Sequence, residues 1–463
     1  MKNISKYLGS LAVLLLCLAC GDNMVEKGPI KRSGQADVIS LDDDWRFIRY
    51  GLQADGTRVE EPAGMFEQAT DDSDWETLDV PHDFAIKGPF RMDLAGNTGR
   101  LPFQGIGWYR KTFTVDEADQ GKRFYVDFDG VMANAQVWLN GEYVGTWPYG
   151  YNSFRLDLTP FIQVGKENLL AVRTDTEKWD SRWYPGAGIY RHVWLVKTGQ
   201  VHVRHWGTKM ETTNLTEKTA DLHFTVEVEN HLNEDAKAVV KTSVYELDSL
   251  DCLGKRVLRF DDQTLPLKAM SAGKVDLQKQ MDDCKRWDIE SPNRYMACVT
   301  IQVDGEETDR YYTPFGVREI SVSRDGFFLN GRRVEIKGVC NHHDLGALGA
   351  AFNRSALERQ FRIMREMGCN SIRTSHNPPA PELLDLADKT GMLIMDEAFD
   401  AWAHGKREWD YNKLYEEWHE KDLEALVRRD WNHPSVVFWS IGNEVLEQQN
   451  VEMTRHLVEI VKE

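Results

Sequence analysis

The sequence predicts a multidomain protein with a β jelly-roll domain, an immunoglobulin-like β-sandwich and an incomplete (β/α)8 TIM barrel, in that order. Up to about residue 318, short runs of alternating apolar and polar residues are separated by turn residues, a pattern typical of antiparallel sandwiches. After residue 318, apolar runs alternate with helical periods, which indicates a parallel sheet. The chain has 463 residues, which is too long for a single hydrophobic core.

The composition indicates a globular protein. Hydrophobic residues make up 41% of the chain and there are 15 Trp, whereas disordered chains are poor in both. Exposed Trp and Tyr rings also suit stacking against sugar rings, although most of them are expected in the core. The net charge of −18 repels phosphate backbones, so no nucleic-acid partner is expected.

Residues 1–19 are predicted to be a lipoprotein signal peptide. Lys2 and Lys6 precede an apolar run from Leu8 to Leu18 that is too short to span a bilayer. Leu18-Ala19-Cys20 resembles the bacterial lipobox, in which the Cys carries the lipid. The protein is therefore expected to be exported and membrane-anchored through Cys20, in the periplasm or at the cell surface. An ordinary signal peptide with an incidental Cys is the alternative.

The segment 20–36 is predicted to be a flexible tether, since it is polar and rich in Gly and basic residues. Five Cys remain in the chain after Cys20, and none has metal-ligand spacing. Their odd number implies at least one free thiol. Cys252 and Cys284 share a predicted domain and are a candidate disulfide pair.

Residues 37–199 are predicted to form the jelly roll, and residues 200–318 the second sandwich. In the first segment, Asn140-Gly141 separates two alternating runs and predicts a hairpin, because a type I′ turn needs positive φ at both central residues. The second segment contains "DLHFTVEVEN", "KAVVKTSVYEL" and "MACVTIQVDG" over a length that suits an immunoglobulin-like fold. Each sandwich is expected to close its own core.

Residues 319–463 are predicted to form the first half of the barrel, which in full needs about 250 residues. The expected strands are "VEIKGVC", "NSIRTS", "MLIMDEAF" and "VVFWSIGNE". A capping box at Ser355 to Glu358 predicts the start of the first helix. The second helix is expected from about Pro381 to Thr390, and the third from about Tyr415 to Arg429.

Polar residues follow all four of these strands, at the face where barrels place their catalytic groups. A lone His or Asp at a strand end is often structural, but four such clusters together predict a shared site. The clusters are Asn341, His342, His343 and Asp344; Arg373, Ser375, His376 and Asn377; Asp396, Glu397 and Asp400; and Asn443 and Glu444.

Glu444 is the foremost catalytic candidate. It follows an apolar strand, so its carboxyl is expected at a pocket floor where burial raises its pKa, as a general acid requires. Asn443 offers a donor and an acceptor to a sugar hydroxyl. His342 and His343 raise the alternative of a zinc hydrolase, but neighbouring residues of an extended segment point to opposite sides.

The sequence resembles glycoside hydrolase family 2, which contains β-galactosidases, β-glucuronidases and β-mannosidases. The resemblance rests on "NSIRTSHNPPAPELLDLADKTGMLIMDEAF" and "RDWNHPSVVFWSIGNE", with "GWYRKTFTV" and "SRWYPGAGIYR" in the sugar-binding domain. It implies that Glu444 is the general acid/base, that Asn443 contacts the sugar 2-hydroxyl, and that His342 and His376 line the subsite for the terminal sugar.

Three further residues are implied less directly. Asp400 matches the region where related enzymes place a carboxylate near the sugar, and Asp180 or Arg182 is expected to reach into the same pocket. Asn377 replaces the Tyr that is usual after the signature His. Some β-galactosidases of the family use magnesium or sodium, but the magnesium ligands have no match after Asp396-Glu397. No metal or other cofactor is therefore expected.

The motif "GVCNHHDLGALGAA" is most similar to β-galactosidases, so the expected function is hydrolysis of terminal β-D-galactosyl residues, with a β-linked oligosaccharide or glycoside as substrate. A β-glucuronide or β-mannoside is the alternative substrate. A non-catalytic carbohydrate-binding lipoprotein or an inactive remnant is the alternative function, and homo-oligomerisation stays open. The family's retaining mechanism needs a second carboxyl as nucleophile, which is expected beyond residue 463. Four acidic residues are predicted to lie in the helix after strand four, away from the site: Glu447, Glu452, Glu459 and Glu463.

Overall fold

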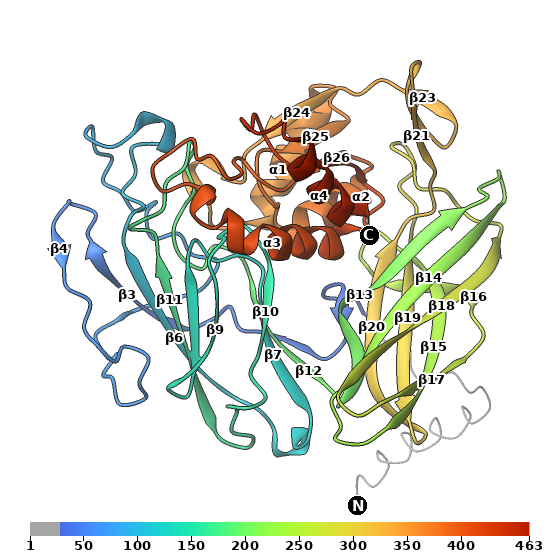
Figure 1. The fold of residues 1–463 in the computed structure, drawn as a ribbon, viewed down its shortest axis with the longest axis horizontal. Coiled ribbons are helices and arrows are strands. Elements are labelled where there is room, and N and C mark those ends of the chain that lie inside the picture. The colour runs from blue at the N-terminus through green and yellow to red at the C-terminus, as the bar shows by residue number, and fades with distance from the viewer. Residues whose placement is uncertain (1–27, 463) are drawn as a thin grey trace, which may run out of the picture.

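The computed structural model describes residues 28–462, so the predicted signal peptide and Cys20 lie outside the described residues. Two β-sandwiches stand side by side, and a parallel sheet with its helices sits against both of them (Figure 1). The predicted fold class is confirmed. Among the described helices, none has the length and apolar character needed to cross a membrane.

The jelly roll consists of two antiparallel sheets. Asn140 and Gly141 join two strands of the larger sheet with φ values of 56° and 90°, so the predicted hairpin is confirmed. The smaller sheet has the order β10 (Phe154–Asp157), β7 (Arg123–Phe128), β12 (Val193–Thr198), β2 (Val38–Ser40). The larger sheet has the order β4 (Arg58–Val59), β3 (Trp45–Leu52), β6 (Ile106–Thr114), β11 (Glu167–Asp175), β8 (Ala135–Leu139), β9 (Glu142–Trp147), with β5 (Glu76–Leu78) paired to β3.

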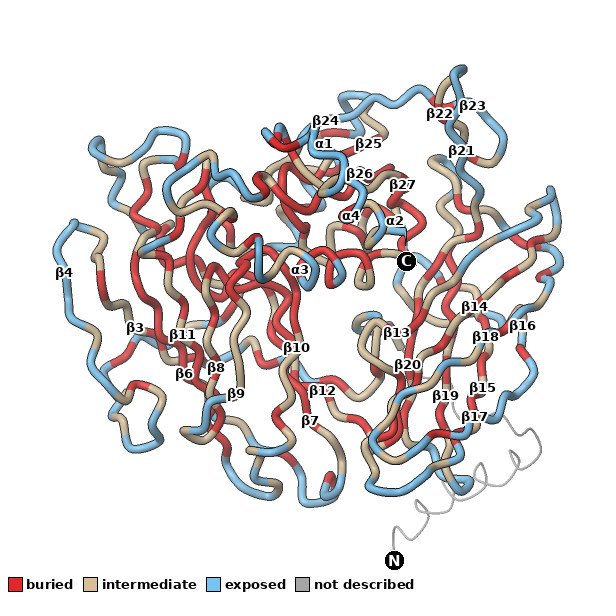
Figure 2. Tube along the Cα trace, in the orientation of Figure 1, coloured by how far each residue is buried: buried red, intermediate tan, exposed pale blue. Residues whose placement is uncertain are grey.

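The second sandwich closes its own core, as predicted. Alternate residues of its strands are buried between the two sheets, as the colouring of Figure 2 shows. Cys252 and Cys284 are both free thiols, so the candidate disulfide was wrong. One sheet is β13 (Val201–Thr213), β14 (Thr219–Asn230), β18 (Ser271–Asp282). The other is β1 (Gly34–Gln35), β20 (Glu306–Phe315), β19 (Arg294–Val303), β15 (Ala236–Leu247), β16 (Leu253–Arg259), with β17 (Gln263–Leu267) paired to β15.

The described part of the predicted tether is not a free linker. Strand β1 pairs antiparallel with β20, and Ile30 is buried against the second sandwich. Gln35 also donates from Nε2 to the carbonyl of Val203 at 2.8 Å. The prediction of a flexible tether was therefore wrong for residues 28–36. Its polar composition does not prevent β pairing, because backbone hydrogen bonds need no apolar side chains.

The four predicted barrel strands form one parallel sheet in chain order: β24 (Gly338–Asn341), β25 (Ser371–Thr374), β26 (Leu393–Glu397) and β27 (Val436–Ser440). A small antiparallel sheet precedes it: β21 (Ile320–Ser323), β22 (Gly326–Leu329) and β23 (Arg332–Val334). The helices are α1 (Arg354–Glu366), α2 (Pro381–Thr390), α3 (Tyr415–Asp430) and α4 (Val451–Lys462). Helix α1 begins after Asn353, whose side chain caps the Ala356 amide at 3.0 Å, so the capping box predicted at Ser355 was wrong.

The jelly roll does not close its own core. Its buried apolar side chains form one continuous cluster with residues of the β26 loop, α3 and α4, including Phe399, Tyr411 and Leu457. Buried polar contacts cross the same boundary: the Arg191 guanidinium donates to the carbonyls of Pro378 and Pro379. The expectation of separate cores was therefore wrong for this domain, and the loops of the jelly roll are held firmly against the sheet.

Candidate active site

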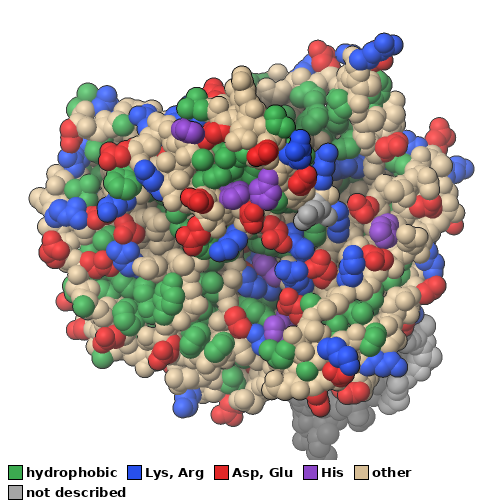
Figure 3. All heavy atoms as spheres, in the orientation of Figure 1, with side chains coloured by type: hydrophobic (Ala, Val, Ile, Leu, Met, Phe, Trp, Pro, Cys, Tyr) green, Lys and Arg blue, Asp and Glu red, His purple; other side chains and the backbone are tan. Residues whose placement is uncertain are grey.

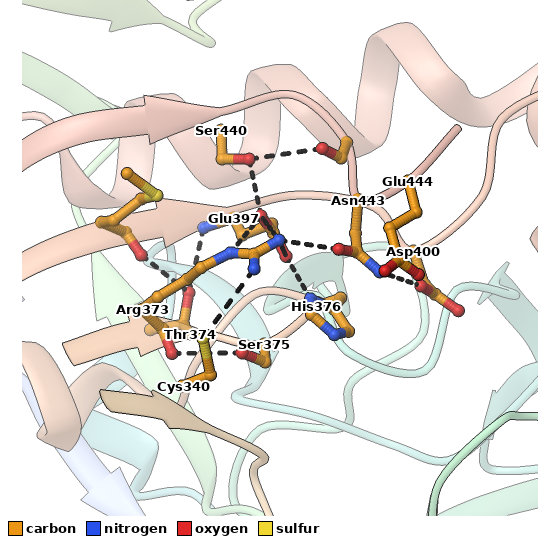
Figure 4. A network of polar contacts seen from close by, with 12 residues as sticks. Cys340, Arg373, Thr374, Ser375, His376, Glu397, Asp400, Ser440, Asn443 and Glu444 are labelled. Atoms are coloured by element: carbon orange, nitrogen blue, oxygen red, sulfur yellow. Dashed lines mark hydrogen bonds and ion pairs between the residues drawn. The ribbon is translucent and has the colours of Figure 1, made fainter. Parts of the chain in front are cut away.

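The carboxyl ends of β25 and β26 are joined by an ion pair between Arg373 and Glu397, and Ser440 at the end of β27 also bonds Glu397. Arg373 donates from Nε and Nη2 to the two carboxylate oxygens at 2.9 and 3.0 Å (Figure 4). Glu397 is fully buried and also accepts from His376 Nδ1 at 2.5 Å and from Ser440 Oγ at 2.6 Å. Its carboxylate is thus saturated with donors, which marks it as an anchor for the site.

Asn443 connects this anchor to Asp400. Its Oδ1 accepts from Arg373 Nη2 at 2.8 Å, and its Nδ2 donates to Asp400 Oδ1 at 2.8 Å. Lys406 holds the same pair from the other side, because its ammonium lies 3.1 Å from Asp400 Oδ1 and donates to the Asn443 carbonyl at 2.5 Å. Lys406 was not predicted as a site residue, since it lies in a loop without periodicity.

Arg182 brings the jelly roll into the site. It donates from Nε and Nη2 to the two Asp400 oxygens at 3.0 and 2.6 Å. Burial acts to raise the pKa of Asp400, but hydrogen bonds from Arg182 and Asn443 and the charge of Lys406 outweigh it and hold this pKa low. Asp400 is therefore ionised at neutral pH.

Glu444 stands beside this ion pair, but its environment is not the predicted one. The side chain is 70% exposed, and Arg182 Nη1 lies 3.1 Å from its Oε2. The hydrogen bond and charge of Arg182 lower the pKa of Glu444 instead of raising it. The expectation of a buried carboxyl with a raised pKa was wrong, because the chain turns out of the sheet after β27, with Glu444 at a φ of 46°.

An aromatic wall faces the two predicted histidines. The ring of Trp183 lies 4.5 Å from that of His342 and 4.8 Å from that of His376, centroid to centroid. Burial and the neighbouring His376 lower the pKa of His342, so this ring is neutral at neutral pH. Trp183 lies in the motif "SRWYPGAGIYR" but was not predicted as a site residue.

Two of the candidate residues point elsewhere. His343 bonds the Pro185 carbonyl at 3.0 Å, whereas the His342 ring packs against those of Trp183 and His376. The Asp180 carboxyl accepts from the Ser181 amide at 2.8 Å. It is therefore engaged within its own loop, and Arg182 is the residue of that loop that joins Asp400.

The other acidic residues predicted in the helix after β27 do not all lie in that helix, α4. Glu452 and Glu459 lie on α4, as predicted, whereas Glu447 precedes this helix. The Glu447 carboxyl is nearly buried and accepts from both the backbone amide and Nδ1 of His404. Glu463 lies outside the described residues.

Within the described chain, two groups could hold a metal ion, both away from this site: His202, Glu229 and His231; and His419, Glu420 and His456.

The surface of the protein is electrostatically mixed on one face. On the face shown in Figure 3, basic, acidic and histidine side chains are interleaved, and hydrophobic side chains form separate small groups. The site itself has the same character, since Arg182, Arg373 and Lys406 are each paired with a carboxylate.

Comparison with known proteins identifies three consecutive matches to one family. The sugar-binding-domain model of glycosyl hydrolases family 2 matches residues 39–199, a second model of the family matches residues 201–318, and its TIM-barrel-domain model matches residues 320–463.

Individual relatives agree with this assignment. A β-galactosidase of Bacteroides ovatus is 47% identical over 88% of this chain and 46% of its own length, and a putative β-glucuronidase of Formosa agariphila is 35% identical over 91% and 39%. The solved structure of a glycosyl hydrolase family 2 member from Bacteroides cellulosilyticus superposes with a TM-score of 0.85, at 36% identity, over 92% of this chain and 54% of that one. The chain spans about half the length of the curated relatives it matches.

Proposed function

Because the chain belongs to glycosyl hydrolase family 2, we propose that it provides the acid/base part of a retaining β-glycosidase site for terminal β-D-galactosyl residues. The observation that carries the proposal is a cluster in which Arg182 donates to both Glu444 and Asp400. Asn443 donates to Asp400, and the Arg182 guanidinium lies 4.4 Å from the centroid of the Trp183 ring. Carboxylates, an amide and an aromatic face are the groups that bind sugar hydroxyls and the apolar face of a sugar ring.

In this mechanism, Glu444 protonates the leaving oxygen and then takes a proton from the attacking water. The contact with Arg182 favours the ionised carboxylate. In the full site, the nucleophile carboxylate about 5–5.5 Å away opposes this effect, since a like charge raises the pKa of its neighbour. After the nucleophile is glycosylated its charge is gone, and Glu444 returns to the ionised form that a base needs.

We assign the nucleophile to a residue outside the described chain. Glu397 is buried and saturated by its donors, so it has no lone pair directed to a sugar carbon. Asp400 is clamped by a bidentate guanidinium and an ammonium, which weaken a carboxylate as a nucleophile. Both residues therefore serve better to bind and orient.

The assignment to a galactoside rests on the resemblance of the motif "GVCNHHDLGALGAA" to β-galactosidases. The name of the Bacteroides ovatus relative points the same way.

The test assays the full product of the gene with aryl β-galactoside, β-glucuronide and β-mannoside. We expect turnover of the galactoside in the usual enzyme range of about 1–10³ s⁻¹ and much lower kcat/KM for the other two. A preference for the glucuronide would contradict the substrate assignment, and no turnover of any of the three would favour the non-catalytic alternative. Residues 20–463 alone should be inactive, and turnover by this fragment would contradict the assignment of the nucleophile.

A further inference from the structure

Two helices of the barrel half bring together three side chains that can ligate a metal ion. His419 and Glu420 lie on α3 and His456 lies on α4, and the two helices pack against each other (Figure 1). One ligand atom from each residue lies within 4.8 Å of the other two. Tetrahedral ligands about 2.0–2.1 Å from a zinc ion are about 3.4 Å apart. Small rotations of Glu420 and His456, which are both exposed, are therefore enough to close the site.

The His419 ring is oriented for ligation by its own helix. Its Nδ1 lies 2.6 Å from the Tyr415 carbonyl, and because a carbonyl only accepts, the proton is on Nδ1. The Nε2 atom therefore carries a lone pair, and it has no hydrogen-bond partner among the described residues. The ring also stacks on the buried Tyr415 ring, with centroids 4.4 Å apart and planes at 10°. Metal-bound histidines typically hold one nitrogen against a backbone carbonyl in this way.

Glu420 and His456 complete the ligand set across the helix boundary. His456 Nε2 donates to Glu420 Oε1 at 2.8 Å, and no Lys or Arg of the described chain forms an ion pair with Glu420. A metal dication can replace the shared proton, because a neutral imidazole can carry its proton on Nδ1 instead. The rings of His419 and His456 meet at 67° with centroids 5.6 Å apart, so their in-plane lone pairs can converge on one ion.

The charges on the two helices favour a cation. Three acidic residues lie one turn from a ligand and share its helix face: Glu416, Glu452 and Glu459. The basic residues Lys421 and Arg455 are adjacent in sequence to a ligand, and adjacent residues of a helix do not face each other. The Lys421 ammonium lies over the Trp418 ring, 4.4 Å from its centroid. The cluster is therefore open to solvent and set among carboxylates.

The second group, His202, Glu229 and His231, lacks this geometry. Its two imidazole rings are parallel within 7° at a centroid distance of 5.1 Å, so their lone pairs lie in separate planes. His202 Nε2 already bonds the Tyr125 hydroxyl at 3.2 Å, and Arg204 Nε lies 3.6 Å from Glu229. We expect no metal there, which makes this group a natural control.

We propose that His419, Glu420 and His456 bind a transition-metal dication, for which Zn²⁺ is the best match. Two imidazole nitrogens and one carboxylate oxygen, with water in the fourth position, are a common ligand set of zinc. The ion joins α3 to α4 at the protein surface. Sequence spacing does not reveal this group, since 36 residues separate Glu420 from His456. None of the three residues takes part in the contacts around Asp400 and Glu444, so the proposal does not depend on the proposed function.

The binding test titrates Zn²⁺ into the metal-free full product of the gene. We expect one ion per chain at this site, with a Kd that rises at least about 100-fold in His456→Ala, because loss of a residue that merely orients a ligand already costs about 10–100-fold. His231→Ala is the matched control, since it removes a histidine that also bonds a glutamate, and it should keep the wild-type Kd. No zinc binding by the wild type, or equal binding by the wild type and His456→Ala, would overturn the proposal.

The spectrum of bound Co²⁺ tests the ligands independently. Tetrahedral Co²⁺ absorbs visible light far more strongly than octahedral aqueous Co²⁺, so the bands report the geometry of the site. We expect strong bands in the wild type and in His231→Ala, and their loss in both His456→Ala and Glu420→Gln. Both of these substitutions are at exposed positions, so the fold is not at risk. Strong bands that persist in either variant, or that disappear in His231→Ala, would contradict the assignment of these ligands.

Discussion

The Arg182 guanidinium lies 3.1 Å from the Glu444 carboxylate, although 262 residues separate the two in the chain. Arg182 belongs to a jelly-roll loop and Glu444 follows the strand β27, so this single contact crosses the boundary between two domains. It determines the charge state of the proposed acid/base, because the cation stabilises the ionised carboxylate.

Removal of this cation should change the pH dependence of catalysis. In Arg182→Ala, the pKa of Glu444 should rise, since its main stabilising contact is lost, and the alkaline limb of the kcat/KM profile should move to higher pH. Arg182→Lys keeps a positive charge and should move the limb less. An alkaline limb that stays in place in Arg182→Ala would mean that Arg182 does not set the protonation of Glu444.

The role of Glu444 as proton donor predicts a dependence on the leaving group. Glu444→Gln should lower the rate about 10²–10⁴-fold for substrates with poor leaving groups, which need protonation, and much less for activated aryl glycosides. The measurement is kcat/KM over a series of aryl β-galactosides whose phenols differ in pKa. Equal losses across the series would reject Glu444 as the acid.

A buried carboxyl at the domain boundary should make stability depend on pH. Asp422 accepts hydrogen bonds from Tyr411, Trp147 and Asn152, and burial raises its pKa to about 7. The folded protein therefore holds this proton more tightly than the unfolded chain, whose Asp pKa is about 3.9. The resulting stabilisation is complete below about pH 4 and is lost as the pH rises through 7.

Asp422→Asn removes this titration. The difference in free energy of unfolding, variant minus wild type, should therefore increase by up to about 4 kcal/mol as the pH rises from about 4 to 7. It should be constant above pH 8. Guanidinium unfolding of both proteins across this range measures the difference. A difference that does not vary with pH would show that Asp422 is ionised throughout.

We propose from the sequence that the protein is exported and held at a membrane through a lipid on Cys20. Cys20→Ser should then move the protein from the membrane fraction to the soluble fraction of cells. Cys17→Ser, within the apolar run, serves as the control and should leave the distribution unchanged. Unchanged fractionation of Cys20→Ser would remove the basis for the anchor.

Much of the framework could be predicted because local signals agreed with the fold. Helix α2 has the predicted limits, since Pro381 opens it and Gly391 closes it in the left-handed conformation. The parallel strands were recognised by their apolar runs between helical periods. The start of α1 was misplaced because Asn353 and Ser355 are both good caps, and only the structure shows which side chain reaches the amide.

The site could be predicted in its members but not in its electrostatics. The residues after each strand were found because parallel strands end at one edge. The exposure of Glu444 could not be inferred, since it depends on how the chain turns after β27 and on a cation from another domain. Lys406 lies on a loop whose path is set by tertiary contacts, and no periodic pattern in the sequence records such contacts.

The continuous core that joins the jelly roll to the β26 loop, α3 and α4 limits how this architecture can be recombined. A chimera that takes its sugar-binding domain from one homologue and its catalytic domain from another would break that core along its apolar boundary, at a cost like that of several large-to-small core substitutions. The second sandwich has a core of its own, so it should tolerate exchange or insertion far better. Successful recombinants should therefore inherit the first and third domains as a pair, although the second domain lies between them in the gene.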